Sequence, residues 1–436
     1  MVDYFTKNIY DTCMPSEIKT EFESIGYDNI INYILNRGIN EGVPNLNNFI
    51  EMTKKFMLCN RKDVCRSVED LQRRLNESGC KNTPGVHLNV YMRPKKSHEV
   101  EILSAVAASL KTIGDVSHLV DIGDGKGYLS SLLSLHYKIP VLGIDAIEIN
   151  TIGAIKRAEK LGKSWHGIVG TNKSILPKSE QRLQNPDSLL YKQITQYITE
   201  KTNLKELVKN IFDQDISYLG IVGLHTCGDL APSALKIYVN NNDVRTICNV
   251  SCCYHLLSER TLDEKDEDHF GFPMSKFLKD KEFYLGRNAR MLSAHSTDRI
   301  LDRKQLPNKN VFHRAVFEVF LNQHFPDLNT REVGRFKMSN VEFNVYAKRA
   351  LKKLDIGADF SDEELDDFYK SFGYKQSQLY AFSLLRSMLA PLIETLILLD
   401  RLLYLNESGF ENSYLVQLFD PVVSPRCYGI VSFKKM

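Results

Sequence analysis

The spacing of hydrophobic residues changes near residue 97. Before that point apolar residues recur at helical intervals, and in the stretch "NLNNFIEMTKKFMLC" they are Phe49, Met52, Phe56 and Met57. From Ser97, predicted as a helix N-cap, an amphipathic helix runs to Gly114, and short apolar runs then alternate with helical stretches. The pattern predicts a helical N-terminal domain over residues 1–91 and an α/β domain over residues 92–436.

Seven apolar runs of the second domain have the length and bounding residues of strands. The first five alternate with helices, which is typical of a parallel sheet covered on both faces, and the last two follow a long helix and predict a hairpin. Residues 172–217, with a helix around "SLLYKQITQYITEKT", and residues 256–375 are predicted as insertions. The predicted strands are residues 118–123, 139–145, 165–171, 218–226, 244–252, 413–420 and 427–435.

Composition and charge narrow the class of protein. The chain of 436 residues is 43% hydrophobic and 25% charged, with a formal net charge of +2, which argues against an unaided, strongly basic nucleic-acid binder. The start "MVDYFTKNIYDTCM" lacks the apolar core of a secretory signal, so we expect a reducing, cytoplasmic or nuclear location. Residues 384–405 are apolar but carry four ionisable groups, and we expect a buried helix and no membrane span.

The strongest chemical signal is the turn "VDIGDGKGYLS", residues 120–130. The strand ends near Asp121, and Gly123, Gly125 and Gly127 then allow a tight turn and the close approach of a ligand to the backbone. Asp145, at the end of the next strand, can accept hydrogen bonds from both hydroxyls of a ribose. Together these features predict a site for a nucleoside cofactor.

The spacing of this turn selects among nucleoside cofactors. Dinucleotide sites usually show G-x-G-x-x-G, in which helix N–H groups bind a pyrophosphate. Here the spacing is D-x-G-x-G-x-G, and the acid at the lip of the turn suits a cofactor with a cationic amino-acid tail and no phosphate. This reading favours S-adenosylmethionine.

Several segments then resemble one family. The stretches "MRPKKSHEVEIL", "VDIGDGKGYLS", "GLHTCGDL", "CCYH", "GFPMS", "NARMLSAHS", "LIETLILLDRLLYL" and "LFDPVVSPR" are similar to the methyltransferase-like protein 25 family, also described as ribosomal RNA adenine dimethylase domain-containing. The resemblance implies a Rossmann-like class I methyltransferase fold with a seven-stranded, mostly parallel sheet. The family's usual turn reads DxGSGKG, and this chain has Asp124 in place of the serine, within the expected cofactor-binding set.

The methyl acceptor is expected beyond the carboxyl ends of the strands, where four candidate catalytic residues lie. We expect Tyr254 and His255 to orient or deprotonate the acceptor, with His225 and Asp229 nearby. The segment "LHTCGD" lacks the Asn/Asp-Pro-Pro-Tyr type of motif of true adenine dimethylases. By family analogy the expected acceptor is RNA, with a protein side chain second. The alternative is a binding or scaffold protein without turnover, and the oligomeric state is left open.

The cysteines of "LHTCGD" and "NVSCCYH" admit metal, redox and packing interpretations. Neighbouring residues on a strand point to opposite faces, so Cys252 and Cys253 would need a bend to face one ion. No C-x-x-C or H-x-x-x-H spacing is present in these segments. We therefore predict no metal site and assign Cys227 and one cysteine of the pair to packing.

Overall fold

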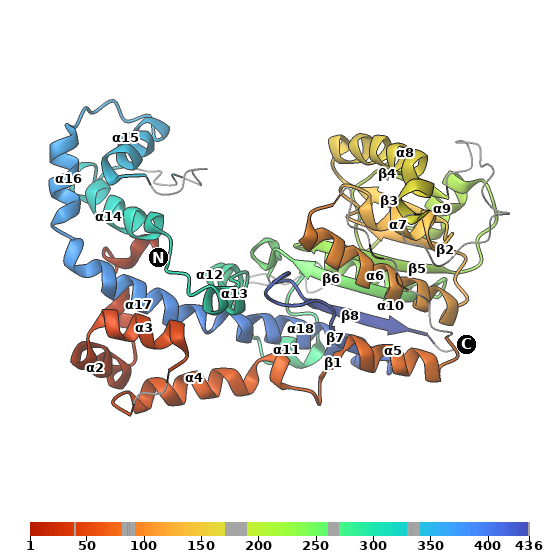
Figure 1. The fold of residues 1–436 in the computed structure, drawn as a ribbon, viewed down its shortest axis with the longest axis horizontal. Helices are drawn as coiled ribbons and strands as arrows, with labels where there is room; N and C mark the ends of the chain where they lie inside the picture. The colour runs from red at the N-terminus through yellow and green to blue at the C-terminus, as the bar shows by residue number, and fades with distance from the viewer. Residues whose placement is uncertain are drawn as a thin grey trace. The chain divides into compact units, whose positions relative to one another are not determined.

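The computed structural model describes residues 1–38, 41–80, 85, 87, 92–170, 190–259, 270–328, 333 and 341–434, without the side chains of 166–170. The chain forms two compact units (Figure 1). The helical unit comprises Met1–Lys55 and Thr297–Leu389, and the sheet unit comprises Phe56–Ser296 and Ala390–Met436. This division differs from the predicted domains, because residues 56–91 join the sheet unit and much of the predicted 256–375 insertion joins the helical unit.

The sheet unit is built on one eight-stranded sheet with the order β1-β7-β8-β6-β5-β2-β3-β4. Strand β8 is antiparallel to both neighbours, and all other pairs are parallel. This confirms the predicted α/β class and the closing hairpin, with eight strands where seven were predicted. The strands are β1 Cys65–Ser67, β2 His118–Ile122, β3 Val141–Asp145, β4 Tyr191–Thr195, β5 Leu219–Cys227, β6 Val244–Cys252, β7 Ser413–Gln417 and β8 Tyr428–Phe433.

The third strand of the βα series was predicted in the wrong place. Residues 165–170 continue helix α8 (Glu148–Gly170), because a short apolar run fits a helix as well as a strand. Strand β4 instead lies within the predicted 172–217 insertion, in the stretch expected to be helical. It pairs with β3 from Val141↔Tyr191 to Asp145↔Thr195. Pairing with the free edge of β3 thus overrides the local helical pattern.

Helices cover both faces of the sheet, as the alternation of strands and helices predicts. Leu119 faces a core shared with α6 and α7, whereas its neighbour Val120 faces a core shared with α9, α10 and α18. Helix α6 begins at Pro94, so Ser97 lies inside it, and the predicted end at Gly114 is confirmed. The helices are α5 Val68–Glu77, α6 Pro94–Ile113, α7 Tyr128–Leu135, α9 Leu204–Phe212, α10 Leu230–Asn240, α11 Lys276–Asp280, α12 Arg287–Leu292 and α18 Ala390–Glu407.

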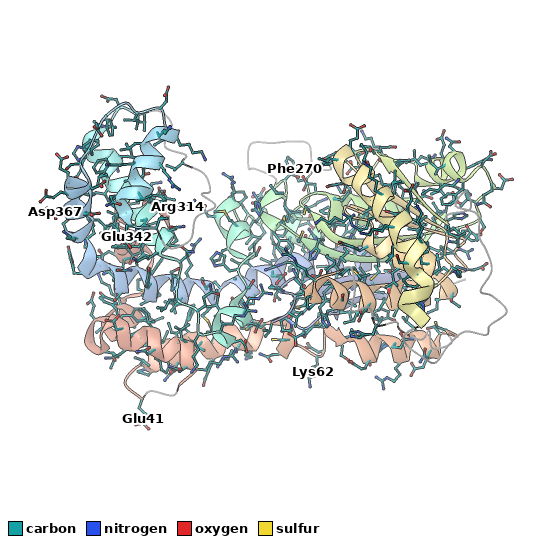
Figure 2. The ribbon with its side chains drawn as sticks, turned by 45° about the horizontal axis from the view of Figure 1, so that its top comes forward. Glu41, Lys62, Phe270, Arg314, Glu342 and Asp367 are labelled. Atoms are coloured by element: carbon teal, nitrogen blue, oxygen red, sulfur yellow. The ribbon has the colours of Figure 1, made fainter. Side chains whose placement is uncertain are left out.

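The described residues of the helical unit contain helices and no strand. One hydrophobic core joins helices from both of its chain segments, and α3 packs against α17. Figure 2 labels Arg314 on α14 and Asp367 on α16. The helices are η1 Val2–Tyr4, α1 Ile9–Cys13, α2 Ser16–Ile25, α3 Tyr27–Asn36, α4 Pro44–Phe56, α13 Thr297–Asp302, α14 Lys309–His324, α15 Phe343–Lys353, α16 Asp362–Lys370, η6 Gly373–Lys375 and α17 Gln376–Ser387.

One helical stretch of the described chain, Gly373–Glu407, is long and apolar enough to cross a membrane by length and composition. Of its most apolar window, 56% is buried inside the protein. Core helices of soluble proteins pass the same criterion, so this stretch is weak evidence for a membrane span. The expectation of no membrane span remains a prediction.

Candidate active site

The glycine-rich turn between β2 and α7 has the backbone conformation that its sequence predicts. Gly123, Gly125 and Gly127 have φ values of +76°, +57° and +69°, a region that favours glycine. The N–H of Gly123 donates to the carbonyl of Ile144 on β3 at 2.8 Å, and that of Gly127 donates to the carbonyl of Asp124 at 3.0 Å. The turn is therefore fixed against the neighbouring strand.

Asp145 ends β3 directly beside this turn. Its Oδ2 accepts the N–H of Gly125 at 3.0 Å, and its Oδ1 accepts the N–H of Ile147 at 2.9 Å and the side-chain amide of Asn150 at 3.0 Å. A carboxylate offers about four acceptor positions, so capacity remains for a ribose hydroxyl. The half-buried Asp145 thus lies where the prediction requires it.

Asp121 places a carboxyl group beneath the turn without full hydrogen bonding. Its Oδ2 accepts from Ser130 at 2.9 Å, whereas its Oδ1 has no hydrogen-bond donor among the described residues. Burial, followed by the charge of Asp124, raises the pKa of Asp121 well above its ordinary value. A buried acceptor without a donor fits a cofactor that brings a cationic amino group to this end of β2.

Asp124, the departure from the family's turn, points into the protein. Its Oδ1 lies 2.7 Å from the Ser130 hydroxyl oxygen, which it shares with Asp121, and its Oδ2 accepts from Tyr191 and Gln193 on β4. A side chain on Gly143 would come within 2.5 Å of the Asp124 carboxylate, so the neighbouring strand leaves room for it. The structure therefore shows Asp124 joining the turn to α7 and β4, where the sequence predicted a cofactor contact.

His225 contacts the buried side chain of Glu99, which the sequence motifs did not identify as a candidate residue. It lies in β5 at φ +66°, where the pairing with β6 shifts by one residue. Its Nε2 is 3.0 Å from Oε1 of Glu99, which is 0% exposed. Burial alone would raise the pKa of Glu99, but the hydrogen bond and charge of His225, with Lys96, hold it below its ordinary range.

Tyr254 does not face a solvent-accessible acceptor site. It is buried beside Leu257 and Phe272, and burial raises the pKa of its hydroxyl above the ordinary value. The hydroxyl donates to Oε1 of Glu394 at 2.9 Å, and Arg426 donates to the same carboxylate oxygen at 2.8 Å. These contacts favour a structural role for Tyr254 over the predicted catalytic one.

The remaining two candidates, Asp229 and His255, lie after the ends of β5 and β6, respectively. Asp229 occupies the N-cap position of α10, and its Oδ1 accepts the N–H of Ser258 at 2.9 Å, which fixes the segment after β6. Nδ1 of His255 is buried and has no hydrogen-bond partner in the described chain. Of the four candidates, His225 has the side-chain arrangement best suited to contact an acceptor.

Cys227, which the sequence assigned to packing, is exposed at the end of β5. Contact with Cys252 lowers the pKa of the Cys227 thiol to about 6. Partial burial acts in the opposite direction, and contact with Cys253 also lowers this pKa. This thiol is therefore more acidic than an ordinary cysteine.

Comparison with known proteins decides the family. A model of the methyltransferase domain matches residues 95–260. The mouse protein named "Probable methyltransferase-like protein 25" is 32% identical over 79% of this chain and 76% of its own length, and the human protein of that name is 31% identical over 79% and 75%. The chain belongs to the methyltransferase-like protein 25 family. The methyltransferase domain confirms the predicted enzyme class, with S-adenosylmethionine as cofactor.

A search of solved structures also finds a methyltransferase. The M. capricolum protein TrmK, solved with S-adenosyl-homocysteine, is 17% identical and covers 57% of this chain and 96% of its own. The TM-score is 0.19, which is too low to bear on function. Membership of the methyltransferase-like protein 25 family therefore rests on the sequence relatives.

Proposed function

We propose that this methyltransferase modifies RNA and that His225 orients the acceptor group. The observation that carries the role of His225 is its contact with the buried Glu99 at the carboxyl end of β5. Strand β5 lies next to β2 in the sheet, with Asp121 opposite Val222, so His225 lies toward the same edge as the glycine turn. Ligands of such sheets bind at this edge.

Bound S-adenosylmethionine supplies the methyl group, and the turn and Asp145 provide its binding site. The backbone at Gly123 and Gly125 lets the cofactor approach closely, and the open capacity of Asp145 receives a ribose hydroxyl. The orphaned oxygen of Asp121 favours a cationic tail at the end of β2. These residues would hold the cofactor at the carboxyl ends of β2 and β3, beside the end of β5.

The Glu99 contact sets the orientation of the His225 ring. In the neutral form of the ring whose Nε2–H donates to the Glu99 carboxylate, Nδ1 is a hydrogen-bond acceptor. No described residue donates to that Nδ1, and the side chain is 23% exposed. An acceptor's N–H or O–H can therefore be held by His225, and the same ring orientation serves every turnover.

RNA is preferred as substrate by fold-level and family analogy, since the family is also described as ribosomal RNA adenine dimethylase domain-containing. The segment "LHTCGD", which leads into α10, lacks the motif that grips an exocyclic amine in those enzymes. A hydrogen-bond acceptor such as His225 suits a hydroxyl as well as an N–H group. We therefore propose RNA as the class of acceptor, and the methylated atom is to be identified by experiment.

Methylation assays on fractionated cell extracts test this proposal. RNA and protein from cells lacking the gene are incubated with the purified full chain and S-adenosylmethionine carrying a labelled methyl group. We expect label in RNA, mass spectrometry then giving the modified nucleoside. His225→Gln should reduce transfer by about 100-fold or more, because acid–base and polar clamps contribute that much, while cofactor binding is retained. His87→Gln, at an exposed position, is the matched control.

Three results would contradict part or all of the proposal. Label in protein and none in RNA assigns the enzyme to protein methylation. Cofactor binding with no transfer to either fraction supports the scaffold alternative. Full activity of His225→Gln would remove His225 from the site while leaving the RNA assignment intact.

A further inference from the structure

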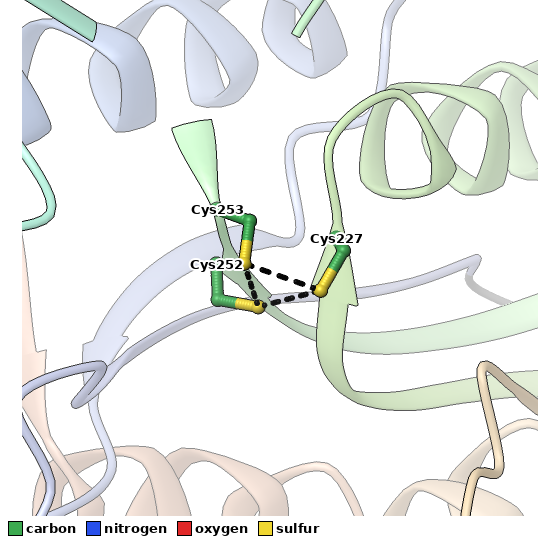
Figure 3. Close-up of side chains that lie close together, drawn as sticks. All are labelled: Cys227, Cys252 and Cys253. Carbon is green, nitrogen blue, oxygen red and sulfur yellow. Dashed lines mark hydrogen bonds between the residues drawn. The ribbon is translucent and has the colours of Figure 1, made fainter. Parts of the chain in front are cut away.

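Three cysteine thiols meet at the ends of β5 and β6 (Figure 3). The Sγ atoms of Cys227 and Cys252 are 3.1 Å apart, those of Cys227 and Cys253 are 3.4 Å apart, and those of Cys252 and Cys253 are 3.6 Å apart. The three sulfurs thus form a nearly equilateral triangle. Three thiols in mutual contact are also the donor set that a soft metal ion prefers.

The backbone explains how two consecutive cysteines share one side. Cys227 and Cys252 are the last residues of neighbouring parallel strands and lie directly opposite each other. Cys253 then takes a left-handed conformation, with φ +52°, and so leaves the strand. Strand alternation no longer applies there, and the physical reason for predicting no metal site is removed.

We propose that Cys227, Cys252 and Cys253 form a binding site for one thiophilic divalent ion, zinc above all. Zinc–sulfur bonds are about 2.3 Å long, and a point at that distance from all three sulfurs lies about 1.2 Å out of their plane. Such a point is the apex of a trigonal pyramid that is steeper than that of an ideal tetrahedral ion, with the position for one further ligand on its open side. Small sulfur shifts suffice to make the site tetrahedral.

The surroundings leave the fourth ligand position accessible. Cys227 is exposed and Cys253 half-buried, while Cys252 closes the inner side. Zinc sites with three protein ligands keep their fourth position for water or a substrate, whereas structural sites use four protein ligands. The site therefore has the ligand count of a reactive centre, next to the strand end that carries His225.

A buried cation nearby lacks a partner that an anionic metal centre would provide. The Arg401 side chain is 1% exposed, and its Nε and Nη2 have no hydrogen-bond partner in the described chain. The Arg401 guanidinium lies 5.8 Å from the ring centre of Tyr254, two residues after Cys252. Three thiolates on a divalent ion carry one net negative charge, which would compensate the buried guanidinium.

A disulfide bond is the alternative to metal binding for these cysteines. Cys227 and Cys252 could form one, but that bond would use two thiols and leave Cys253 in contact with it. A metal ion uses all three and explains why the third sulfur lies at a similar distance from the other two.

Metal analysis of the full chain tests the site. The protein is purified in reducing buffer without chelator, and elemental mass spectrometry should find about one equivalent of zinc. Cys227→Ser, Cys252→Ser and Cys253→Ser should each weaken zinc affinity by at least about tenfold, since even outer contacts of a metal site contribute that much. Cys13→Ser, exposed in the helical unit, should keep the full equivalent.

Cobalt substitution separates ligation from misfolding. The cobalt-loaded wild type should show thiolate-to-metal charge-transfer absorption, and the triple serine variant should lose it while keeping its circular dichroism and cofactor binding. Zinc at the same low level in the wild type and the triple variant would overturn the proposal. Mass spectrometry of alkylated peptides showing a Cys227–Cys252 disulfide would also overturn it. Neither result depends on methylation activity, so the proposed RNA function is tested independently.

Discussion

Asp121 is a buried carboxyl group whose ionisation opposes folding. Burial and the charge of Asp124 raise its pKa above the ordinary 3.8, so the folded chain holds the proton more tightly than the unfolded chain. This group's contribution to stability is full below pH 3.8 and is lost as the pH rises through the folded pKa. At higher pH the protein contains an ionised, incompletely hydrogen-bonded carboxylate.

Asp121→Asn should therefore stabilise the protein at pH 8 and have little effect at pH 4. The asparagine oxygen can still accept from Ser130, and no charge is buried. Each unit of pKa shift corresponds to about 1.4 kcal/mol, so we expect a gain of that order in urea unfolding of the ligand-free protein. Asp280→Asn, at an exposed position, is the control. A gain at pH 4 equal to that at pH 8 would contradict this account.

Asp145→Ala should weaken S-adenosylmethionine binding by about 10- to 100-fold. Hydrogen bonds to a charged group contribute about 1.5–3 kcal/mol, and the substitution also releases the N–H of Gly125 from the carboxylate. Isothermal titration calorimetry gives the affinity, and circular dichroism verifies the fold. Equal binding by the variant and the wild type would remove Asp145 from the cofactor site. Asp280→Ala serves as the matched control.

At the scale of elements, two glycines at helix positions should respond oppositely to alanine. Gly127 precedes α7 at φ +69°, and a Cβ there would lie 3.0 Å from that of Ala154 and closer still to Tyr191. Gly162, inside α8, has no atom within 4 Å of an added Cβ. Gly127→Ala should cost about 1–2 kcal/mol or more, whereas Gly162→Ala should gain about 0.5–1 kcal/mol. Thermal unfolding of the two variants measures the contrast.

The sequence predicted correctly those elements that are determined by residues close together in the chain. The glycine turn and Asp145 are separated by one βα unit, so their meeting follows from the parallel order of the strands. Strand β4 was missed because its register depends on the free edge of β3, which no local pattern reveals. The displaced prediction at residues 165–171 shows the same ambiguity between a short strand and a helix.

The candidate catalytic residues depend on contacts between distant parts of the sequence. Glu99 reaches His225 across 126 residues, and Glu394 reaches Tyr254 across 140. No spacing rule predicts such pairs, although a Glu in an otherwise apolar helix face is a signal that a buried partner exists. The bend at Cys253 could not be predicted either, because the hydrophobic pattern does not indicate that a cysteine has a positive φ.

At the scale of the whole molecule, the sheet unit is assembled from two segments, Phe56–Ser296 and Ala390–Met436, that are separated in the sequence by part of the helical unit. Strands β7 and β8 follow the entire second segment of the helical unit, and β8 pairs with β6. The methyltransferase domain match, residues 95–260, therefore lacks strands that the sheet requires.

A chain limited to residues 56–296 should not fold into a cofactor-binding domain. Removal of β8 leaves the edge of β6 unpaired and exposes the buried core on that side of the sheet. We expect aggregation, and no calorimetric response to S-adenosylmethionine. Within the full chain, Val431→Asp should reproduce the defect, because Val431 is fully buried, while Val423→Asp at an exposed position should not. A soluble, cofactor-binding fragment 56–296 would show that the hairpin is dispensable.

The left-handed backbone at His225 and Cys253 implies a compromise between stability and chemistry. A non-glycine residue in this conformation costs about 1–2 kcal/mol, and glycine or asparagine would relieve much of it. A protein selected for stability alone would place such residues at both strand ends. Stabilising this enzyme by consensus or glycine substitution should therefore stop short of these two positions, because the proposed roles of His225 and Cys253 each depend on the side chain that such a substitution removes.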